Sequence, residues 1–320
     1  MLSLRRIYNQ AVAVSIGLGV LFPLFLPLSC QDLKNFDFSS LSDSLKKLPE
    51  LKKFLARDNA LLSFRYYPAR SSSKILIMLH GSAYHSAYLH QMGSYLSEND
   101  ITSVCLPNIR GHYKSGNSRG ECSYIGQLED DVFDLIKTLR LENQDVYLGG
   151  HSSGGGLAIR FAGSKYRDEI KGFLLFTPFI PFAKELYEES AVLWANVSVV
   201  KIITLNVLNF FGMKFFNNSV VVSFDMPDCY KDGTETLSYS YNLNTAMHPG
   251  PDYMKDVQSL GDDFLLLVGD GDEMNSFSGY KKIFNDPFCK HVKLIPQAKH
   301  LDIVKNEEAY AEVKKWLQKQ

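Results

Sequence analysis

The sequence predicts an α/β fold in which a mostly parallel central sheet carries helices on both faces. Short apolar segments typical of buried strands recur along the chain, at residues 60–67, 74–80, 101–107, 145–149, 172–178, 262–269 and 291–296. Segments with helical patterning lie between them, at residues 88–98, 127–141, 155–161 and 306–318. Strands that alternate with helices form βαβ units, which build parallel sheets. A chain of 320 residues is long enough for one large core with an insertion.

The alternation of strands and helices is interrupted at residues 180–255. This stretch is far longer than an ordinary connection between two strands, so we expect it to form a helical cap inserted into the fold. The core then comprises residues 59–179 and 256–320. Within the cap, residues 192–216 contain only two charged side chains, both lysines, among many aromatic and aliphatic ones. That composition predicts a pair of helices packed on the core.

The first 30 residues differ from the rest of the chain. Arg5 and Arg6 precede a run without any charged residue at positions 11–29, which is typical of a signal sequence or an N-terminal anchor. The run ends in Leu-Ser-Cys, which is similar to a relaxed lipoprotein signal with Cys30 as the lipidated residue. We therefore expect an exported or membrane-associated protein, held at a membrane through its N-terminus. Its location would be the cell envelope if Cys30 carries a lipid.

Residues 31–58 form a polar stretch between this segment and the predicted core. Residues 41–55 place leucines and lysines at helical spacing, so we expect an amphipathic helix there. The whole stretch is expected to act as a tether.

The remaining cysteines are Cys105, Cys122, Cys229 and Cys289. An even number in an exported chain permits up to two disulfides, with three possible full pairings. Cys105 lies in a predicted strand and is equally well explained as a small buried apolar residue. None of the four is in a context that predicts catalysis.

Charge and motifs exclude several classes of function. The formal net charge is −1, which gives no basis for a nucleic-acid partner. The chain has no phosphate-binding loop of the Walker type, no C-x-x-C pair and no H-E-x-x-H segment. We therefore expect no metal ion, nucleotide or other cofactor.

A serine between glycines is the most informative feature of the sequence. Residues 150–154 read Gly-His-Ser-Ser-Gly, directly after a strand-like run and directly before a helix-like run. In such a G-x-S-x-G turn the glycines permit a sharp backbone, and the helix N-terminus directs its amides at developing negative charge. The pattern predicts Ser152 as a nucleophile. An ordinary glycine-rich turn is the alternative, and the flanking strand and helix argue against it.

A serine hydroxyl needs a base to act as a nucleophile. In proteins whose nucleophile lies in a G-x-S-x-G turn, the order along the chain is serine, then acid, then histidine. Three histidines follow Ser152. His300 lies in a loop just past a predicted strand, where its side chain can reach the serine. His291 would begin that strand at the opposite end of the sheet, and His248 precedes a Pro-Gly loop. We therefore predict His300 as the base.

The acid is expected after the preceding strand, where it can accept the imidazole N–H and fix the tautomer of the base. Residues 269–273 read Gly-Asp-Gly-Asp-Glu at that place. Asp270 and Asp272 are both candidates, whereas Glu273 is better explained as part of a solvated turn.

A second junction between a strand and a loop is expected to complete the site. Residues 80–83 read His-Gly-Ser-Ala after a predicted strand, and the glycine allows the backbone to approach the reacting carbonyl. We predict that the backbone amides of Ser82 and Ser153 form an oxyanion hole. His80 is expected to order this loop and not to take part in the chemistry.

These motifs resemble those of the α/β-hydrolase superfamily, and in particular its lysophospholipase and monoacylglycerol-lipase-like branch. Residues 80–86 (His-Gly-Ser-Ala-Tyr-His-Ser) look like the oxyanion loop of that branch. Residues 107–115 resemble its D-x-R-G-H-G-x-S loop, with Asn108 in place of the usual aspartate and Tyr113 in place of the usual glycine. Residues 127–131 match the start of the helix before the nucleophile strand. The likeness covers the chain from about residue 60 to residue 316.

The resemblance implies an α/β-hydrolase fold and a triad of Ser152, Asp272 and His300, since Asp272 stands at the family's usual spacing from Gly269. It implies a serine hydrolase that cleaves carboxylic esters through an acyl-enzyme. The apolar cap and N-terminus favour lipid-like monoacyl substrates, such as a monoacylglycerol or a lysophospholipid, with the cap lining the acyl chain or docking on a membrane. An acyltransferase or thioesterase with the same site, and a non-catalytic binding protein on this fold, are the alternatives.

Overall fold

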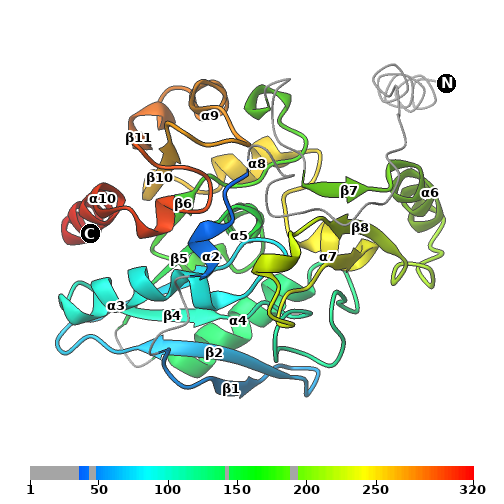
Figure 1. Ribbon diagram of the computed structural model, residues 1–320, viewed down its shortest axis with the longest axis horizontal. Coiled ribbons are helices and arrows are strands. Elements are labelled where there is room, and N and C mark those ends of the chain that lie inside the picture. The colour runs from blue at the N-terminus through cyan, green and yellow to red at the C-terminus, as the bar shows by residue number, and fades with distance from the viewer. Residues whose placement is uncertain (1–35, 43–47, 141–143, 188–193) are drawn as a thin grey trace.

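Residues 36–42, 48–140, 144–187 and 194–320 are described by the computed structural model (Figure 1). Within them the main sheet has eight strands in the order β1-β2-β4-β3-β5-β6-β10-β11. These are β1 (Lys52–Leu55), β2 (Leu61–Tyr67), β3 (Lys74–Leu79), β4 (Ser103–Pro107), β5 (Asp145–His151), β6 (Gly172–Phe176), β10 (Phe264–Gly269) and β11 (Val292–Ile295). Strand β2 is antiparallel to both neighbours, and all other neighbours in this sheet are parallel. The predicted mostly parallel sheet is therefore confirmed.

Helices cover both faces of the sheet. The helices of the core are α3 (His90–Glu98), α4 (Gln127–Leu139), α5 (Ser153–Ala162), α8 (Tyr253–Gln258), α9 (Phe277–Ile283) and α10 (Glu307–Lys319). Helix α10 packs against α3, where the rings of Tyr95 and Tyr310 stack 4.8 Å apart. Helix α5 contacts α4 and α8. Since neither face of the sheet is left to solvent, every residue of β4, β6 and β10 is buried.

Single turns of 3-10 helix lie in the connections, at η2 (Ser86–Leu89), η3 (Arg167–Glu169), η4 (Lys184–Leu186), η5 (Asp228–Tyr230), η6 (Phe288–His291) and η7 (Ile303–Lys305).

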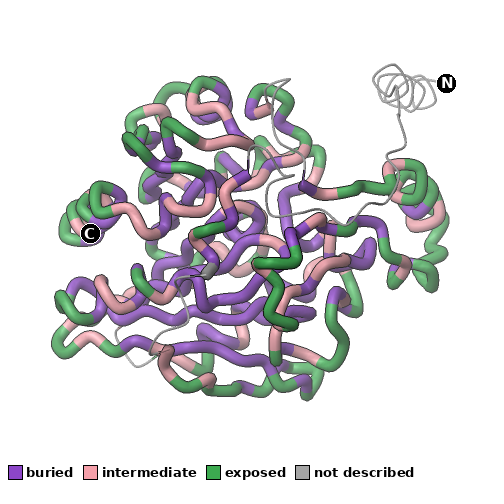
Figure 2. The backbone as a smooth tube through the Cα atoms, in the orientation of Figure 1, coloured by how far each residue is buried: buried purple, intermediate pink, exposed green. Residues whose placement is uncertain are grey.

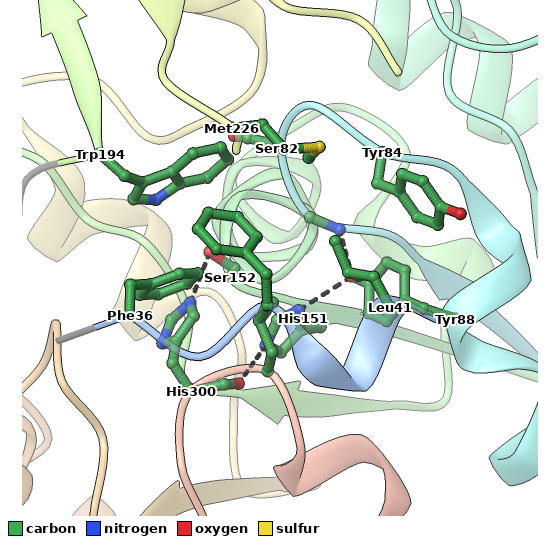
Figure 3. Close-up of a pocket in the computed structure, with 13 residues that line it drawn as sticks. Phe36, Leu41, Ser82, Tyr84, Tyr88, His151, Ser152, Trp194, Met226 and His300 are labelled. Atoms are coloured by element: carbon green, nitrogen blue, oxygen red, sulfur yellow. Dashed lines mark hydrogen bonds between the residues drawn. The ribbon is translucent and has the colours of Figure 1, made fainter. Parts of the chain in front are cut away.

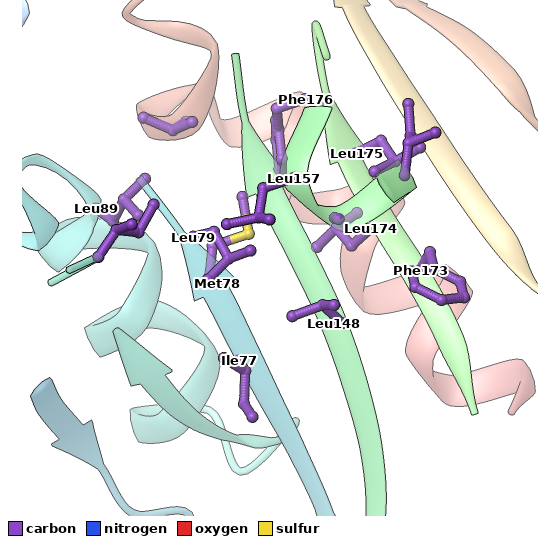
Figure 4. Packing of buried hydrophobic residues seen from close by; sticks show 14 of the residues in the cluster. Ile77, Met78, Leu79, Leu89, Leu148, Leu157, Phe173, Leu174, Leu175 and Phe176 are labelled. Carbon is purple, nitrogen blue, oxygen red and sulfur yellow. The ribbon is translucent and has the colours of Figure 1, made fainter. Parts of the chain in front are cut away.

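The core lies between the helices and the central strands (Figure 2). The register aligns Ile77 of β3 with Leu148 of β5, and Leu148 with Phe173 of β6. These three buried side chains form part of the packing in Figure 4, and burial of each stabilises the fold by roughly 1.5–3 kcal/mol. The same register brings the carboxyl ends of β3, β5 and β6 to one edge of the sheet. Side chains in the loops at that edge can therefore meet.

The segment between β6 and β10 contains a second, antiparallel sheet in the order β7-β8-β9. Its elements are β7 (Ala195–Val197), α6 (Val199–Phe210), β8 (Val220–Phe224), β9 (Ser238–Ser240) and α7 (Tyr241–Ala246). The expected pair of helices over residues 192–216 is wrong for its described part, residues 194–216, where a strand precedes a single helix. Residues 195–197 become a strand because they pair with β8, and α6 is followed by Gly212 at φ +79°.

The expected amphipathic helix at residues 41–55 is also wrong for residues 48–55. Residues 41 and 42 belong to helix α2 (Ser39–Ser42) and residues 43–47 lie outside the described part, but residues 52–55 form strand β1, whose backbone pairs with β2. Phe54 and Ala56 are buried whereas Leu55 between them faces solvent, as expected of alternating sides in an extended chain. Backbone hydrogen bonding to the edge of β2 therefore decided the conformation of residues 52–55, and the helical spacing of leucines and lysines did not. Residues 36–42 lie against the body of the protein and do not extend from it as a tether.

Cys105, Cys122 and Cys289 are free thiols, so none of the three full disulfide pairings forms. Cys105 is buried in β4, as expected of a small apolar residue. The predicted signal or anchor at residues 1–30, including Cys30, lies outside the described residues. Among the helices that are described, none has the length and hydropathy needed to span a bilayer.

Gly150, at the end of β5, tests how tightly the sheet packs against α5. A Cβ atom there would overlap the backbone of Gly154. We expect Gly150→Ala to lower the free energy of unfolding by about 3 kcal/mol, because the overlap is with main chain that cannot rotate away. The matched control is Gly250→Ala, where a Cβ meets nothing within 4 Å, and we expect a change of roughly 0.5 kcal/mol or less. Urea unfolding followed by circular dichroism measures both, and equal effects would contradict this account.

Candidate active site

Ser152 occupies a sharp turn between β5 and α5. Its backbone has φ 54° and ψ −122°, a conformation that side-chain-bearing residues rarely adopt and that costs energy. The turn is held by hydrogen bonds from Ser152 N to Phe176 O (3.0 Å) and from Phe179 N to Ser152 O (2.8 Å). Gly154 is required beside it, because a Cβ there would overlap the carbonyl oxygens of Leu79 and His80. The strained turn therefore depends on close backbone contact between β5, α5 and the loop after β3.

The loops after β10 and β11 bring an acid and a base to this serine. His300 Nε2 lies 3.0 Å from Ser152 Oγ, as Figure 3 shows. On the other side of the imidazole, Nδ1 lies 3.0 Å and 3.1 Å from the two carboxylate oxygens of Asp272. Asp270 is exposed and has no contact with the imidazole, whereas Glu273 accepts a hydrogen bond from the backbone N–H of His300 (2.9 Å). The three predicted residues thus form a continuous row.

The surroundings of Asp272 keep it ionised. It is buried, which disfavours its charge, but the nearby His300 and two backbone donors, Met274 N and Asn275 N at 2.9 Å each, hold the pKa of the carboxyl below its ordinary value. Burial also disfavours the charged form of His300, but the carboxylate of Asp272 more than compensates and raises the pKa of the imidazole above its ordinary value. The pair can therefore stabilise an imidazolium that forms in this site.

The loop after β3 is held at its start by Tyr88 and His151. Gly81 N donates to Tyr88 Oη (2.6 Å), so the tyrosine hydroxyl in turn donates to His151 Nδ1 (2.9 Å). The proton of His151 is then on Nε2, which donates to the carbonyl oxygen of His300 (2.7 Å). Burial, and after it His300, lowers the pKa of His151 to about 3, so this ring is neutral. One chain of hydrogen bonds therefore joins the loop at Gly81 to the backbone of the base.

A second tyrosine–histidine pair holds the other end of the loop. Ala83 N donates to Tyr239 Oη (2.8 Å), and the Tyr239 hydroxyl donates to His112 Nε2 (2.6 Å). His112 Nδ1 faces the carbonyl oxygens of Ile109 and Arg110, both at 3.2 Å. Burial lowers the pKa of His112 to about 4, which keeps this ring neutral as well. Tyr239 comes from β9, so the cap takes part in shaping the loop.

The two tyrosines thus accept hydrogen bonds from the backbone amides on either side of Ser82. Neither Ser82 N nor Ser153 N, at the first position of α5, donates to another group of the described chain. The side chains of the two serines are joined, with Oγ atoms 2.9 Å apart. The residues predicted for an oxyanion hole therefore lie side by side next to Ser152, with their amides available.

His80 and Asn108 order the loops beneath the site. Ile109 N donates to His80 Nε2 (2.9 Å), and His80 Nδ1 donates to Gly81 O (2.8 Å). His80 is therefore a structural residue in this arrangement, in agreement with its expected role. The Asn108 side chain accepts from Ser86 N (3.0 Å) and donates to Tyr113 O (2.8 Å). Its amide supplies both a donor and an acceptor, which an aspartate carboxylate could not do.

A small pocket lies in front of Ser152 (Figure 3). Its polar side consists of Ser82, His151, Ser152 and His300. Its apolar side consists of Phe36, Phe38, Leu41, Trp194, Met226 and Leu301. In the described part of the chain, no carboxylate, lysine or arginine lines the pocket. The described residues also contain no cluster of three or more histidine, cysteine or acidic side chains that could hold a metal ion.

Several functional residues were not predicted from the sequence. Tyr88, Tyr239 and His112 hold the loop but carry no local signal, because their partners are distant in the chain. His151 sits within the G-x-S-x-G turn, and the motif names its position as variable. Phe36 and Phe38 lie in a stretch that was expected to be a tether.

A mostly parallel sheet with a serine, histidine and aspartate row at the carboxyl ends of its strands defines an α/β hydrolase. The chain belongs to the serine aminopeptidase S33 family (Hydrolase_4), whose model matches residues 70–307. A comparison with curated protein sequences found no match.

Three solved structures show the same fold. A soluble variant of monoglyceride lipase from Saccharomyces cerevisiae, in complex with a substrate analog, has a TM-score of 0.65 and 17% identity, over 86% of this chain and 97% of that one. A monoacylglycerol lipase from Paleococcus ferrophilus has a TM-score of 0.58 and 19% identity, over 80% and 98%. A thermophilic esterase from Thermogutta terrifontis has a TM-score of 0.57 and 19% identity, over 84% and 98%.

Removing the hydroxyl of Tyr88 tests the role of the loop contacts. In Tyr88→Phe, Gly81 N and His151 Nδ1 both lose their partner, and the loop after β3 loses its link to the backbone of His300. We expect kcat to fall about 100-fold with little change in KM, because small misplacements of reacting groups cost rate more than binding. Tyr239→Phe should act in the same direction through Ala83. Tyr95→Phe, remote from the site on α3, is the control, and steady-state hydrolysis is the measurement. A control and a test variant with equal kcat would contradict this role.

Proposed function

We propose that this protein is a serine hydrolase that cleaves carboxylic esters of lipid-like monoacyl compounds. Ser152 Oγ attacks the acyl carbonyl while His300 Nε2 takes its proton, and the amides of Ser82 and Ser153 stabilise the oxyanion. Asp272 orients the imidazole and stabilises its charge. His300 then protonates the departing alcohol. In the second half of the reaction a water molecule, deprotonated by the same histidine, releases the acid from Ser152.

One observation carries this proposal: the Ser152 hydroxyl lies 3.0 Å from His300 Nε2, beside two backbone amides that have no other partner in the described chain. A nucleophile, a base and an oxyanion site must all lie within about 3 Å of the reacting atoms for acyl transfer. A binding protein on this fold would have no need for a strained nucleophile turn or for an ionised carboxylate buried behind a histidine.

The character of the pocket favours esters over peptides. An aminopeptidase binds the charged amino terminus of its substrate, and burial of that charge requires an opposite charge beside it. The pocket in front of Ser152 has no carboxylate among its described lining residues. An uncharged ester with an apolar chain needs no such partner, and its chain would contact the aromatic and aliphatic side of the pocket.

A lipid-like substrate is supported by the surface of the cap. Large apolar side chains are exposed on α6 and in the loop after it, among them Val200, Phe210, Phe211 and Phe215. The same stretch has lysines but no acidic residue between positions 195 and 223. Exposed aromatic residues with nearby lysines are typical of proteins that contact a lipid surface. A membrane-directed N-terminus, as expected from residues 1–30, would place the pocket near such substrates.

Labelling with a fluorophosphonate tests the nucleophile. We expect the wild-type protein to be labelled and the Ser152→Ala variant to lose both labelling and ester hydrolysis, by a factor of about 10⁶ in kcat. Ser118→Ala, on an exposed loop, is the matched control and should retain both. The substrate panel should include monoacylglycerols, lysophospholipids, short esters, an acyl thioester and an amino-acid anilide. Labelling that persists in Ser152→Ala would refute the assignment, and preference for the anilide would replace ester hydrolysis with peptide hydrolysis.

The pH dependence of hydrolysis tests the pairing of His300 with Asp272. Only neutral His300 can take the serine proton, so kcat/KM should fall as the pH drops through a pKa above the ordinary histidine value. In Asp272→Asn the carboxylate that contributes most to raising this pKa is gone, whereas burial, which lowers it, remains. In the plot of kcat/KM against pH, the fall on the acid side should therefore move to lower pH. The value on the plateau should fall by about 10⁴-fold. Asp270→Asn, on the exposed neighbouring position, should change neither, and the opposite pattern would make Asp270 the acid.

A further inference from the structure

Residues 36–42, which we call the strap, lie across the mouth of the site. Phe36, Phe38 and Leu41 are buried to 6%, 2% and 4% exposure, and all three line the pocket in front of Ser152. The ring of Phe36 lies 5.8 Å from the ring of His300. Figure 3 shows Phe36 and Leu41 among the side chains around Ser152 and His300. A group bound in this pocket beside Ser152 would therefore lie next to the strap.

The strap is fixed to the core by polar contacts, and the charged groups that make them lie outside the pocket. Asp37 Oδ2 lies 3.0 Å from Lys299 Nζ, next in sequence to His300. Hydrogen bonds from Ser39 and Lys299 lower the pKa of Asp37 to about 2, so this pair is ionised. Lys305 Nζ donates to Ser40 O, and Leu41 N donates to Phe38 O (2.9 Å) to close a turn. None of the charged groups in these contacts lines the pocket.

The strap is fixed to the cap by aromatic contacts. Phe36 stacks on Trp194 with ring centroids 5.7 Å apart and an interplanar angle of 15°. Phe38 packs with its ring 5.5 Å from that of Trp194 and 5.8 Å from that of Tyr230. The strap thus bridges the loop that carries the base and the cap. A contiguous apolar surface of Phe36, Phe38, Leu41, Trp194 and Met226 results.

The strap precedes the part of the chain that matches the family, which begins at residue 70. We propose that the strap forms one wall of an acyl-chain subsite and sets the chain-length preference of the enzyme. This rests on the proposed ester hydrolysis. With the carbonyl oxygen at Ser82 and the carbonyl carbon at Ser152, the aliphatic chain of the acyl group contacts Phe36, Phe38 and Trp194.

The test compares the hydrolysis of p-nitrophenyl acetate and p-nitrophenyl octanoate. In Phe38→Ala and in Phe36→Ala, the ratio of kcat/KM for octanoate to that for acetate should fall by about 10-fold or more, mainly through a higher KM for octanoate. The rate on acetate should fall much less than the rate on octanoate, because a two-carbon acyl group does not reach the wall. Phe210→Ala is the matched control, because this phenylalanine is 81% exposed on α6 and does not line the pocket. Phe38→Leu, which keeps an apolar wall, should recover most of the preference.

Two results would overturn the proposal. An unchanged octanoate-to-acetate ratio in both alanine variants, with an unchanged melting temperature, would show that the strap does not contact the chain. An equal rise in both rates would show that the strap only blocks the site. If the alanine variants do not fold, Phe36→Val and Phe38→Val provide the same comparison, because valine shortens the wall while keeping an apolar side chain in the core.

A binding measurement separates this proposal from the catalytic one. The chain has two tryptophans, Trp194 and Trp316, so Trp316→Phe leaves only the one at the pocket. Titration of Ser152→Ala/Trp316→Phe with decanoate should change the Trp194 emission, and addition of Phe38→Ala should weaken binding by about 10-fold. A wild type that hydrolyses none of the esters, together with this loss of binding, would refute the proposed reaction and retain the subsite. Equal decanoate affinity with and without Phe38 would refute the subsite.

Discussion

The active site depends on a backbone contact that only glycine allows. Gly150 and Gly154 on either side of Ser152 let β5 and α5 come together with the loop after β3, at distances that any Cβ atom would prevent. That contact holds Ser152 at a positive φ. It also sets the N-terminus of α5 beside Ser82, so the Ser152 hydroxyl and the two available amides are positioned by one packing constraint. The cost in backbone strain is met by burial of the surrounding sheet.

Around this contact, the neighbouring backbone amides are hydrogen-bonded within the protein, whereas the amide of Ser82 remains available to a ligand. Tyr88 and Tyr239 each accept a backbone amide and donate to a neutral histidine, which leaves the amide of Ser82 between them without a partner. Burial lowers the pKa of both of those histidines, whereas Asp272 raises that of His300. Buried imidazoles in one small region therefore have opposite shifts, and the direction follows from whether a carboxylate lies beside the ring.

The pocket is assembled from three parts of the chain that contribute different properties. The core supplies the polar side through loops at the carboxyl ends of β3, β5, β10 and β11. The cap supplies Trp194 and Met226, and the strap supplies Phe36 and Phe38. Tyr239 couples the cap to the loop after β3, and Phe36 couples the strap to His300. A change in the position of the cap or of the strap would therefore alter both the pocket and the groups that surround the reacting bond.

The fold class and the positions of Ser152 and His300 followed from local pattern, because a strand, a glycine turn and a helix leave their mark on adjacent residues. Asp272 was preferred only because of its spacing from Gly269 in the family. The residues alone left Asp270 as a second candidate for the acid. Tertiary structure decided what depends on distant partners. Residues 52–55 became a strand because β2 offered an edge, and Phe36 and Phe38 became pocket residues because Trp194 and the loop of His300 covered them. Contacts across such separations leave no periodic signal in a single chain, since each residue carries only its own half of the pair.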